Sequence, residues 1–315
     1  MKEQNKMKTT VTKLIYTALA VLSLAIGAVT IDAASGDLLA SINANSKGPD
    51  LVFRNSGGGL SVVNQDGSGS TQILRSGAYP EWGRGGSGTQ ADPYKLVYEP
   101  SPGSGVIGLA GVYLDSRGKP VAGNIRSISA AFAAFWPTYS PAGDRVAFVE
   151  SRPNNNAAIS SIATDGSNEI EHYAAPVGST LLDPVYSPDG SKIAFIEYAI
   201  GNPSTASVKE VDMLGNVTTL VASGTFAGIW SIDLSSNQKL GMEVSDGNNH
   251  YKVYTLDLST PGANPVYLAD GEGVAFSPDG SNIAYTGIGG RNLYIFNGSS
   301  SSLTVRGFAG DPDWR

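Results

Sequence analysis

The sequence predicts an all-β protein, a single six-bladed β-propeller built from four-stranded blades. Three observations support this: a repeated turn-and-strand motif, its spacing, and the complementary ends of the chain. The motif reads aromatic-Ser-Pro-Asp-Gly and precedes a short apolar strand. It is intact at residues 186–190 and 276–280, recognisable at 139–143, and degenerate from Leu234. Repetition of a motif along one chain indicates an array of like structural units.

The spacing of the motif gives the number of blades. A large apolar anchor heads each copy, and successive anchors are 38 to 57 residues apart. Such an interval holds four short strands, which is the content of one propeller blade. The longest interval contains Gly- and Ser-rich insertions at residues 83–91 and 99–105. The six anchors are Trp82, Tyr139, Tyr186, Leu234, Phe276 and Trp314.

The two ends of the chain complete one blade. The first strand pattern, at residues 50–53, has no anchor before it, and the chain stops just after the anchor Trp314. We therefore expect the C-terminal strand to join the N-terminal blade, which removes open sheet edges. The propeller is assigned to residues 50–315. A helical turn competes with a strand only at residues 127–135.

The N-terminus resembles an export signal. Lysines that include Lys2, Lys8 and Lys13 precede an apolar run at residues 14–31, and Ala33 and Ala34 follow. This order is typical of a secretory signal peptide, which we assign to residues 1–34, with 35–49 as a short linker. An uncleaved membrane anchor is the alternative, because the run approaches the length that spans a bilayer. Both interpretations place the propeller outside the cytoplasm, and cleavage would leave a periplasmic or secreted protein with no membrane insertion.

The intact motifs resemble the WD40-like repeats of the TolB family of periplasmic β-propellers. The pattern Pro-x-aromatic-Ser-Pro-Asp-Gly-x-x-Ile-Ala-Phe is complete at residues 184–195 and close to complete at 276–285 and 137–148. The resemblance covers residues 45–315. TolB proteins carry an α/β domain before the propeller, whereas a short linker precedes the first strand here. The resemblance therefore implies a TolB-like propeller without that domain.

The composition argues against several classes of function. The net charge is −7 and no cluster of Lys and Arg appears, so we expect no nucleic-acid partner. The absence of Cys excludes disulfides and thiol nucleophiles, and two histidines are too few for a zinc site. A Gly-x-Ser-x-Gly nucleophile motif is also missing. We therefore expect no catalytic residues.

Calcium is the one cation that the sequence leaves open. Asp-Gly pairs at residues 66–67, 165–166, 189–190 and 246–247 offer carboxylate oxygens. They lack the alternating carboxylates of a calcium-binding loop, and Asp before Gly is typical of tight turns. We interpret them as turns and expect no cofactor, with calcium as the alternative.

Carboxylates cluster just ahead of the anchors. The residue before an anchor is acidic in three blades, and two further carboxylates lie two positions before that residue, in the copies that end at Tyr186 and Trp314. We expect these side chains near the start of the innermost strands, where sixfold repetition gathers them at one mouth of the channel. An exposed acidic rim is one interpretation, and a ligand or cation site is the other. The predicted rim consists of Glu81, Asp183, Asp233, Asp311 and Asp313.

These features favour a non-catalytic, monomeric propeller that binds a protein or peptide, or acts as a scaffold, in the cell envelope. The alternative is a carbohydrate-binding or carbohydrate-active propeller, a lyase or hydrolase, that uses the carboxylate rim. An enzyme should show ionisable groups converging in a deep pocket, whereas a binding module should show an open face with exposed aromatic side chains.

Overall fold

The computed structural model describes residues 48–154, 156–248 and 250–315. The signal peptide expected at residues 1–34 lies outside the described residues, as does the linker up to residue 47. No helix in the described ranges is long and apolar enough to cross a membrane. The described part forms one compact unit.

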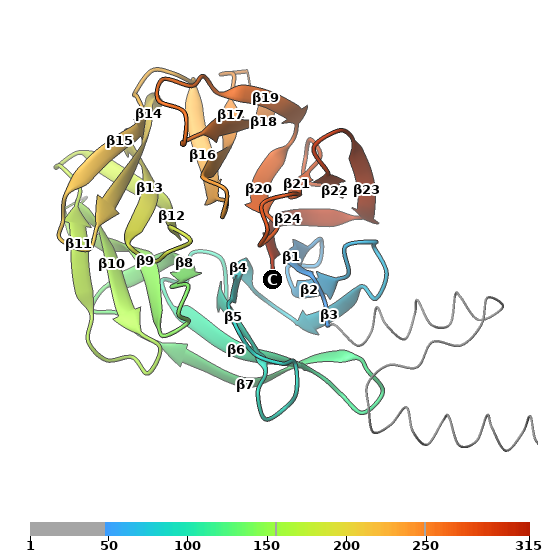
Figure 1. The fold of residues 1–315 in the computed structure, drawn as a ribbon. Helices are drawn as coiled ribbons and strands as arrows, with labels where there is room; N and C mark the ends of the chain where they lie inside the picture. Colours follow the sequence, from blue (N-terminus) through green and yellow to red (C-terminus); the bar gives the residue numbers. More distant parts are fainter. Residues whose placement is uncertain (1–47, 155, 249) are drawn as a thin grey trace, which may run out of the picture. The chain divides into compact units, whose positions relative to one another are not determined.

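Six four-stranded antiparallel sheets are arranged in a ring around a central axis (Figure 1). Blade 1 contains β24 (Phe308–Trp314), β1 (Leu51–Asn55), β2 (Leu60–Val63) and β3 (Thr71–Leu74). Blade 2 contains β4 (Ala78–Gly83), β5 (Tyr94–Glu99), β6 (Ile107–Leu114) and β7 (Pro120–Ile128). Blade 3 contains β8 (Ala133–Tyr139), β9 (Arg145–Arg152), β10 (Asn156–Ala163) and β11 (Ile170–Ala174).

The other three blades repeat the same order from the channel outwards. Blade 4 contains β12 (Ser179–Tyr186), β13 (Lys192–Ala199), β14 (Asn202–Asp212) and β15 (Val217–Val221). Blade 5 contains β16 (Gly228–Leu234), β17 (Lys239–Ser245), β18 (Tyr251–Asp257) and β19 (Val266–Asp270). Blade 6 contains β20 (Glu272–Phe276), β21 (Ile283–Thr286), β22 (Asn292–Phe296) and β23 (Ser301–Arg306).

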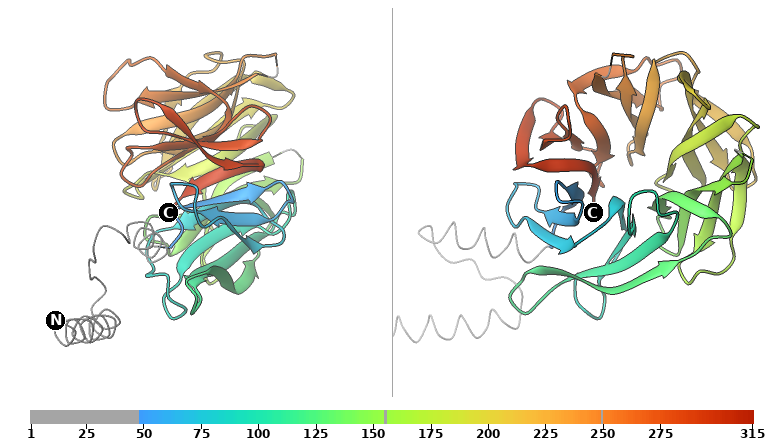
Figure 2. Two further views of the ribbon diagram at one scale, coloured as in Figure 1. Left: turned by 90° about the vertical axis from the view of Figure 1, so that its right-hand side faces the viewer. Right: turned by 180° about the vertical axis from the view of Figure 1, so that it is seen from behind.

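The ring closes as the sequence predicts. β24 pairs with β1, where Trp314 lies opposite Leu51, and both ends of the described chain meet in one sheet (Figure 2). The Arg315 amide donates a hydrogen bond of 2.7 Å to the Asp50 carbonyl. The predicted six-bladed propeller with C-terminal closure is therefore confirmed. The helical turn considered at residues 127–135 is wrong, because β7 and β8 occupy most of that stretch and their apolar side chains pack between blades 2 and 3.

The second strand of each blade is buried on both faces because it packs between two neighbouring blades. In β13, Ala194 and Phe195 are both completely buried. Ala194 faces the core shared with blade 5, whereas Phe195 faces the core shared with blade 3. Successive strand residues point to opposite faces, so a continuous apolar run is what this position requires.

The repeated Ser-Pro-Asp-Gly motif forms the turn between the first and second strands. In blade 4 the Ser187 hydroxyl donates to Asp189 (2.7 Å) and accepts from the Lys192 amide (3.0 Å). The Asp189 carboxylate also accepts from the Ser191 amide, and these hydrogen bonds lower its pKa to about 2. Gly190 adopts a φ of +73°, which glycine tolerates best. The constant residues of the repeat thus satisfy one another locally.

Candidate binding channel

The anchors lie at the ends of the innermost strands. The carboxylates just ahead of the anchors therefore also lie near the strand ends, and not near the strand starts as the sequence predicted. Tyr186 is the last residue of β12 and Trp314 the last of β24. The reason is that the Ser-Pro-Asp-Gly turn follows the innermost strand and leads into the second one. Tyr186 is buried between blades, while the preceding Val185 lines the channel. The position before the anchor therefore does face the channel in five blades, but at the opposite end of the strand, whereas Ala275 of blade 6 is buried in the core.

A β-bulge recurs in the innermost strands three residues before the anchor. The pairing register shifts at this point in five innermost strands, and one residue earlier, at Trp230, in blade 5. Five of the six blades place a residue with positive φ there, and Pro follows in four of them. A bulge bends the strand and re-aims its side chains, and Pro is tolerated there because its missing N–H leaves no ladder bond unmade. The five bulge residues are Tyr79, Trp136, Asp183, Gly273 and Asp311.

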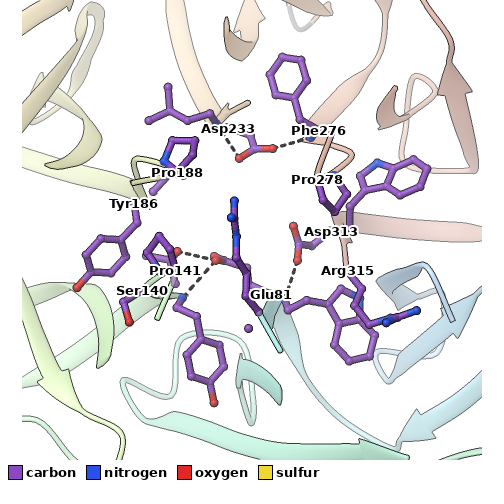
Figure 3. Close-up of a pocket in the computed structure, with 18 of the residues that line it drawn as sticks. Glu81, Ser140, Pro141, Tyr186, Pro188, Asp233, Phe276, Pro278, Asp313 and Arg315 are labelled. Carbon is purple, nitrogen blue, oxygen red and sulfur yellow. Dashed lines mark hydrogen bonds between the residues drawn. The ribbon is translucent and has the colours of Figure 1, made fainter. Parts of the chain in front are cut away.

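Three predicted carboxylates bind the backbone of the next blade. Asp313 accepts a hydrogen bond of 2.6 Å from the amide of the anchor Trp82, and Asp233 accepts one of 2.5 Å from that of Phe276. Glu81 accepts a hydrogen bond of 3.2 Å from the amide of Tyr139, the anchor of blade 3, and one of 2.6 Å from the hydroxyl of Thr138 (Figure 3). These side chains are half-buried inside the channel. The expectation of an exposed rim is therefore wrong, because each carboxylate points inwards to bridge two blades.

The other two predicted carboxylates sit on the bulges and also reach across a blade interface. Asp183 accepts a hydrogen bond of 2.7 Å from the Ile232 amide, and Asp311 accepts one of 3.4 Å from the Tyr79 amide. All five predicted residues thus line one channel, but on two levels: three just before the anchors and two at the bulges.

Two further glutamates were missed by the sequence analysis. Glu99 accepts a hydrogen bond from the amide of the bulge residue Trp136 at 3.1 Å, and Glu243 accepts one from that of Gly273 at 2.6 Å. Both lie in second strands, just after an apolar run. A Glu ends or nearly ends that run in four blades, a recurrence that could have identified them from sequence.

The channel contains two cavities that meet at Glu81, Val185, Asp233 and Asp313, the residues that line both. The turn-side cavity has a volume of ≈ 340 Å³ and is also lined by anchors, Ser-Pro turns and two arginines. The second cavity, which we name the bulge-side vestibule, has a volume of ≈ 580 Å³. Both volumes fall in the range of small-ligand or side-chain pockets.

Aromatic and acidic side chains line the bulge-side vestibule. Tyr79 and Trp136 meet edge to face with ring centroids 5.8 Å apart, and Tyr198 and Trp230 do so at 6.2 Å. The four aromatic rings come from four successive blades, 2 to 5. The carboxylates that line the vestibule, besides those shared with the turn-side cavity, are Asp183, Glu243, Glu272 and Asp311.

Burial changes the acidity of the channel carboxyl groups. Burial raises the pKa of Asp183 to about 6 and those of Asp233 and Glu243 to about 7, although backbone hydrogen bonds oppose the change. The pKa values of Glu81 and Asp313 are raised well above the usual range by burial, and repulsion from Asp313 adds to the effect on Glu81. Several channel carboxyls therefore change charge near neutral pH.

Metal-binding clusters are missing from the described part of the chain. No group of three or more His, Asp or Glu side chains within it could hold a metal ion. His172 lies in the outermost strand β11, where its Nε2 is 2.8 Å from the Ser161 hydroxyl, and His250 lies in an exposed loop. Neither histidine lines either cavity.

No family model and no curated protein matches this chain. Among solved structures, TolB from Acinetobacter baumannii aligns with a TM-score of 0.62 and 20% identity, over 85% of this chain and 67% of that one. Putative TolB from Agrobacterium tumefaciens gives 0.55 and 14%, over 83% and 90%. A chain of the nidogen/laminin complex gives 0.59 and 11%, over 85% and 98%. The predicted likeness to TolB-type propellers is thus confirmed at the level of the fold.

Proposed function

We propose that this chain is a non-catalytic, exported, monomeric β-propeller that holds a polypeptide segment of a partner protein in its channel, in the periplasm or outside the cell. The observation that carries the proposal is the channel itself, in which two contiguous cavities combine aromatic walls with hydrogen-bond acceptors. Aromatic rings supply contact area at low entropic cost, and they are enriched in protein-binding surfaces. The similar folds of TolB and of a chain in the nidogen/laminin complex support protein binding by analogy of fold.

A carbohydrate-binding or carbohydrate-active propeller is the second candidate. Carboxyl groups and aromatic rings converge in the bulge-side vestibule, which is the chemistry that sugar recognition and glycoside cleavage use. Most of these carboxylates, however, already accept hydrogen bonds from the next blade. That structural task explains their placement without a sugar, so protein binding is favoured.

Site-specific photo-crosslinking separates the two candidates. A photoreactive phenylalanine replaces Trp230, which lines the vestibule, in the exported protein expressed in its host. The matched control replaces Tyr267, an exposed aromatic residue of the outer strand β19 in the same blade. We expect a discrete protein adduct from position 230 and not from position 267. Failure to form a position-specific protein adduct, together with retention of the purified protein on envelope polysaccharide, would overturn the proposal in favour of the carbohydrate candidate.

A further inference from the structure

We propose that the bulge-side vestibule binds an organic cation, namely the side chain of a Lys or Arg carried by the bound polypeptide. This inference rests on the proposed function and assigns the chemistry of the segment that enters the channel. The feature that points to it is a cavity whose walls combine two aromatic pairs with charge of one sign.

The aromatic walls suit a cation. The Tyr198–Trp230 and Tyr79–Trp136 pairs both line the vestibule, and 36% of the Trp230 surface is exposed to solvent. An ammonium or guanidinium group is attracted to the negative face of an aromatic ring, most strongly to that of Trp. The alkyl stem of Lys or Arg would cover the apolar surface of the same rings.

The charge of the lining favours a cation over a neutral or anionic group. Seven Asp and Glu side chains line the vestibule, whereas no Lys, Arg or His is among the described residues that do so. Arg54 does not line the vestibule, but its positive charge attracts the Asp311 carboxylate and opposes the rise in its pKa. Burial and mutual repulsion disfavour the ionised carboxylates, and a cation placed among them would relieve that repulsion.

The carboxylates keep acceptor capacity for a ligand. Glu243 binds the Gly273 amide through Oε2, and Asp311 binds the Tyr79 amide through Oδ2. Their second oxygens have no hydrogen-bond partner within the described part of the chain, and a carboxylate accepts several hydrogen bonds. Charge-assisted bonds from an ammonium or guanidinium group are stronger than neutral ones.

The two cavities differ in a way that orients the ligand. Arg84 and Arg315 line the turn-side cavity, where they offset the three carboxylates that it shares with the vestibule and so weaken its attraction for a cationic side chain. The bulge-side vestibule lacks such groups among its described lining residues. We therefore infer that the basic side chain of the bound segment lies at the bulge end of the channel.

Two peptides that differ only in charge test the inference. The probes are acetyl-Gly-Ser-Arg-Ser-Gly-amide and the same peptide with neutral citrulline in place of Arg, titrated calorimetrically at low salt. We expect the Arg peptide to bind about tenfold more tightly than the citrulline peptide and to lose affinity as salt increases. Equal affinities, or no measurable binding of either peptide, would overturn the cation inference. The crosslinking result is independent of these probes, so it separates failure of this inference from failure of the proposed function.

Variants locate the site. Trp230→Leu and Asp183→Asn should each weaken binding of the Arg peptide by about fivefold or more. Asn tolerates positive φ, and its amide oxygen can still accept from the Ile232 amide, so the fold should survive. Tyr267→Leu and Asp270→Asn, on the outer strand β19, are the matched controls and should leave binding unchanged. Loss of affinity in the controls but not in the channel variants would place the site elsewhere.

Free agmatine, which carries the same guanidinium on a short chain, distinguishes the two sources of such a cation. We expect the peptide to bind more tightly than agmatine, because its backbone adds contacts along the channel. Agmatine that binds as tightly as the Arg peptide would overturn the assignment to a polypeptide and identify a small amine as the ligand.

Discussion

A glutamate recurs in the second strand of blades 2 to 5, but its partners in blades 3 and 4 differ from those in blades 2 and 5. In blade 3, Glu150 is buried beside the Arg152 guanidinium and accepts from the Ser160 hydroxyl at 2.9 Å. In blade 4, Glu197 pairs with Lys209 at 2.6 Å. Glu99 and Glu243, in blades 2 and 5, accept hydrogen bonds from the bulge amides of the following blades instead.

A neighbouring strand position explains the difference. In blade 4, Glu197 lies opposite Ser207 of β14, and Lys209 follows two residues later on the same face. The equivalent residue in blade 5 is Thr255, because Glu243 lies opposite Val253 of β18. Where its own blade supplies a cation, from the third strand in blade 4 (Lys209) or from the same strand in blade 3 (Arg152), the glutamate pairs within that blade. Where it supplies none, the glutamate turns to the next blade and adds negative charge to the channel region.

The largest expected effect comes from breaking the pair in blade 3. Glu150→Gln removes the more buried of the two carboxylates that compensate Arg152, leaving it only the exposed Glu171, and weakens the hydrogen bond from Ser160. We expect the free energy of unfolding to fall by about 3 kcal/mol, because the guanidinium loses its one buried carboxylate partner. Urea denaturation measures this loss. A fall no larger than that caused by Glu243→Gln would contradict the contrast between the two kinds of glutamate.

The pH dependence of stability should come from the channel carboxyls. The pKa values of Asp183, Asp233 and Glu243 are raised in the folded state, so the folded protein binds these protons more tightly than the unfolded chain. The resulting stabilisation is complete below the unfolded pKa values and is lost as pH rises through about 6 to 7. We expect about 2 kcal/mol more stability near pH 5 than near pH 8.

The matched variant for this prediction combines Asp183→Asn, Asp233→Asn and Glu243→Gln. It should flatten the stability profile between pH 5 and pH 8 while preserving hydrogen-bond acceptors for the next blade. Hydrogen bonds in the turns lower the pKa values of Asp189 and Asp279 to about 2. These two groups therefore have the opposite pH dependence: they stabilise the fold at neutral pH, and their contribution is lost as pH falls towards 2. An unchanged slope in the triple variant would assign the pH dependence to other groups.

A substitution can give blade 5 the lysine that pairs with the glutamate in blade 4. Thr255→Lys places an ammonium on β18 where Lys209 stands on β14. We expect Glu243 to pair with it, which lowers the pKa of Glu243 and raises stability near pH 8 by about 1 kcal/mol. Thermal melts at two pH values measure the gain, and NMR titration of Glu243 reports its pKa. The same change at Thr260, outside the sheet, is the control, and an equal gain there would count against pairing.

The sequence allowed the fold to be predicted because every blade repeats the residues that its turns and core require. Anchors such as Tyr186 recur at blade spacing. The final anchor, Trp314, has no further strands after it in the sequence, which indicated how the ring closes. These residues interact within a blade or with the neighbouring core, so the repeat itself carries the information.

The candidate site was predicted only in part. The sequence placed five carboxylates around one channel, but not their burial, because their hydrogen-bond donors are backbone amides of the next blade and leave no sequence signature. The prolines that follow Asp183 and Asp311 mark the bulges that turn these side chains inwards, but Pro is equally typical of the first residue of a strand, so the sequence does not distinguish the two. Glu99 and Glu243 were overlooked because their positions belong to the second strand rather than to the motif.

The smallest expected effect comes from removing the charge of an uncompensated glutamate. Glu243→Gln leaves an amide oxygen to accept from the Gly273 amide, and burial already raises the pKa of Glu243 to about 7. The folded protein near pH 7 therefore holds much of this group in its neutral form, so we expect the free energy of unfolding to change by less than about 0.5 kcal/mol. Urea denaturation beside Glu150→Gln gives the comparison directly. A loss of several kcal/mol would mean that Glu243 has a cationic partner, and blades 4 and 5 would then use their glutamates alike.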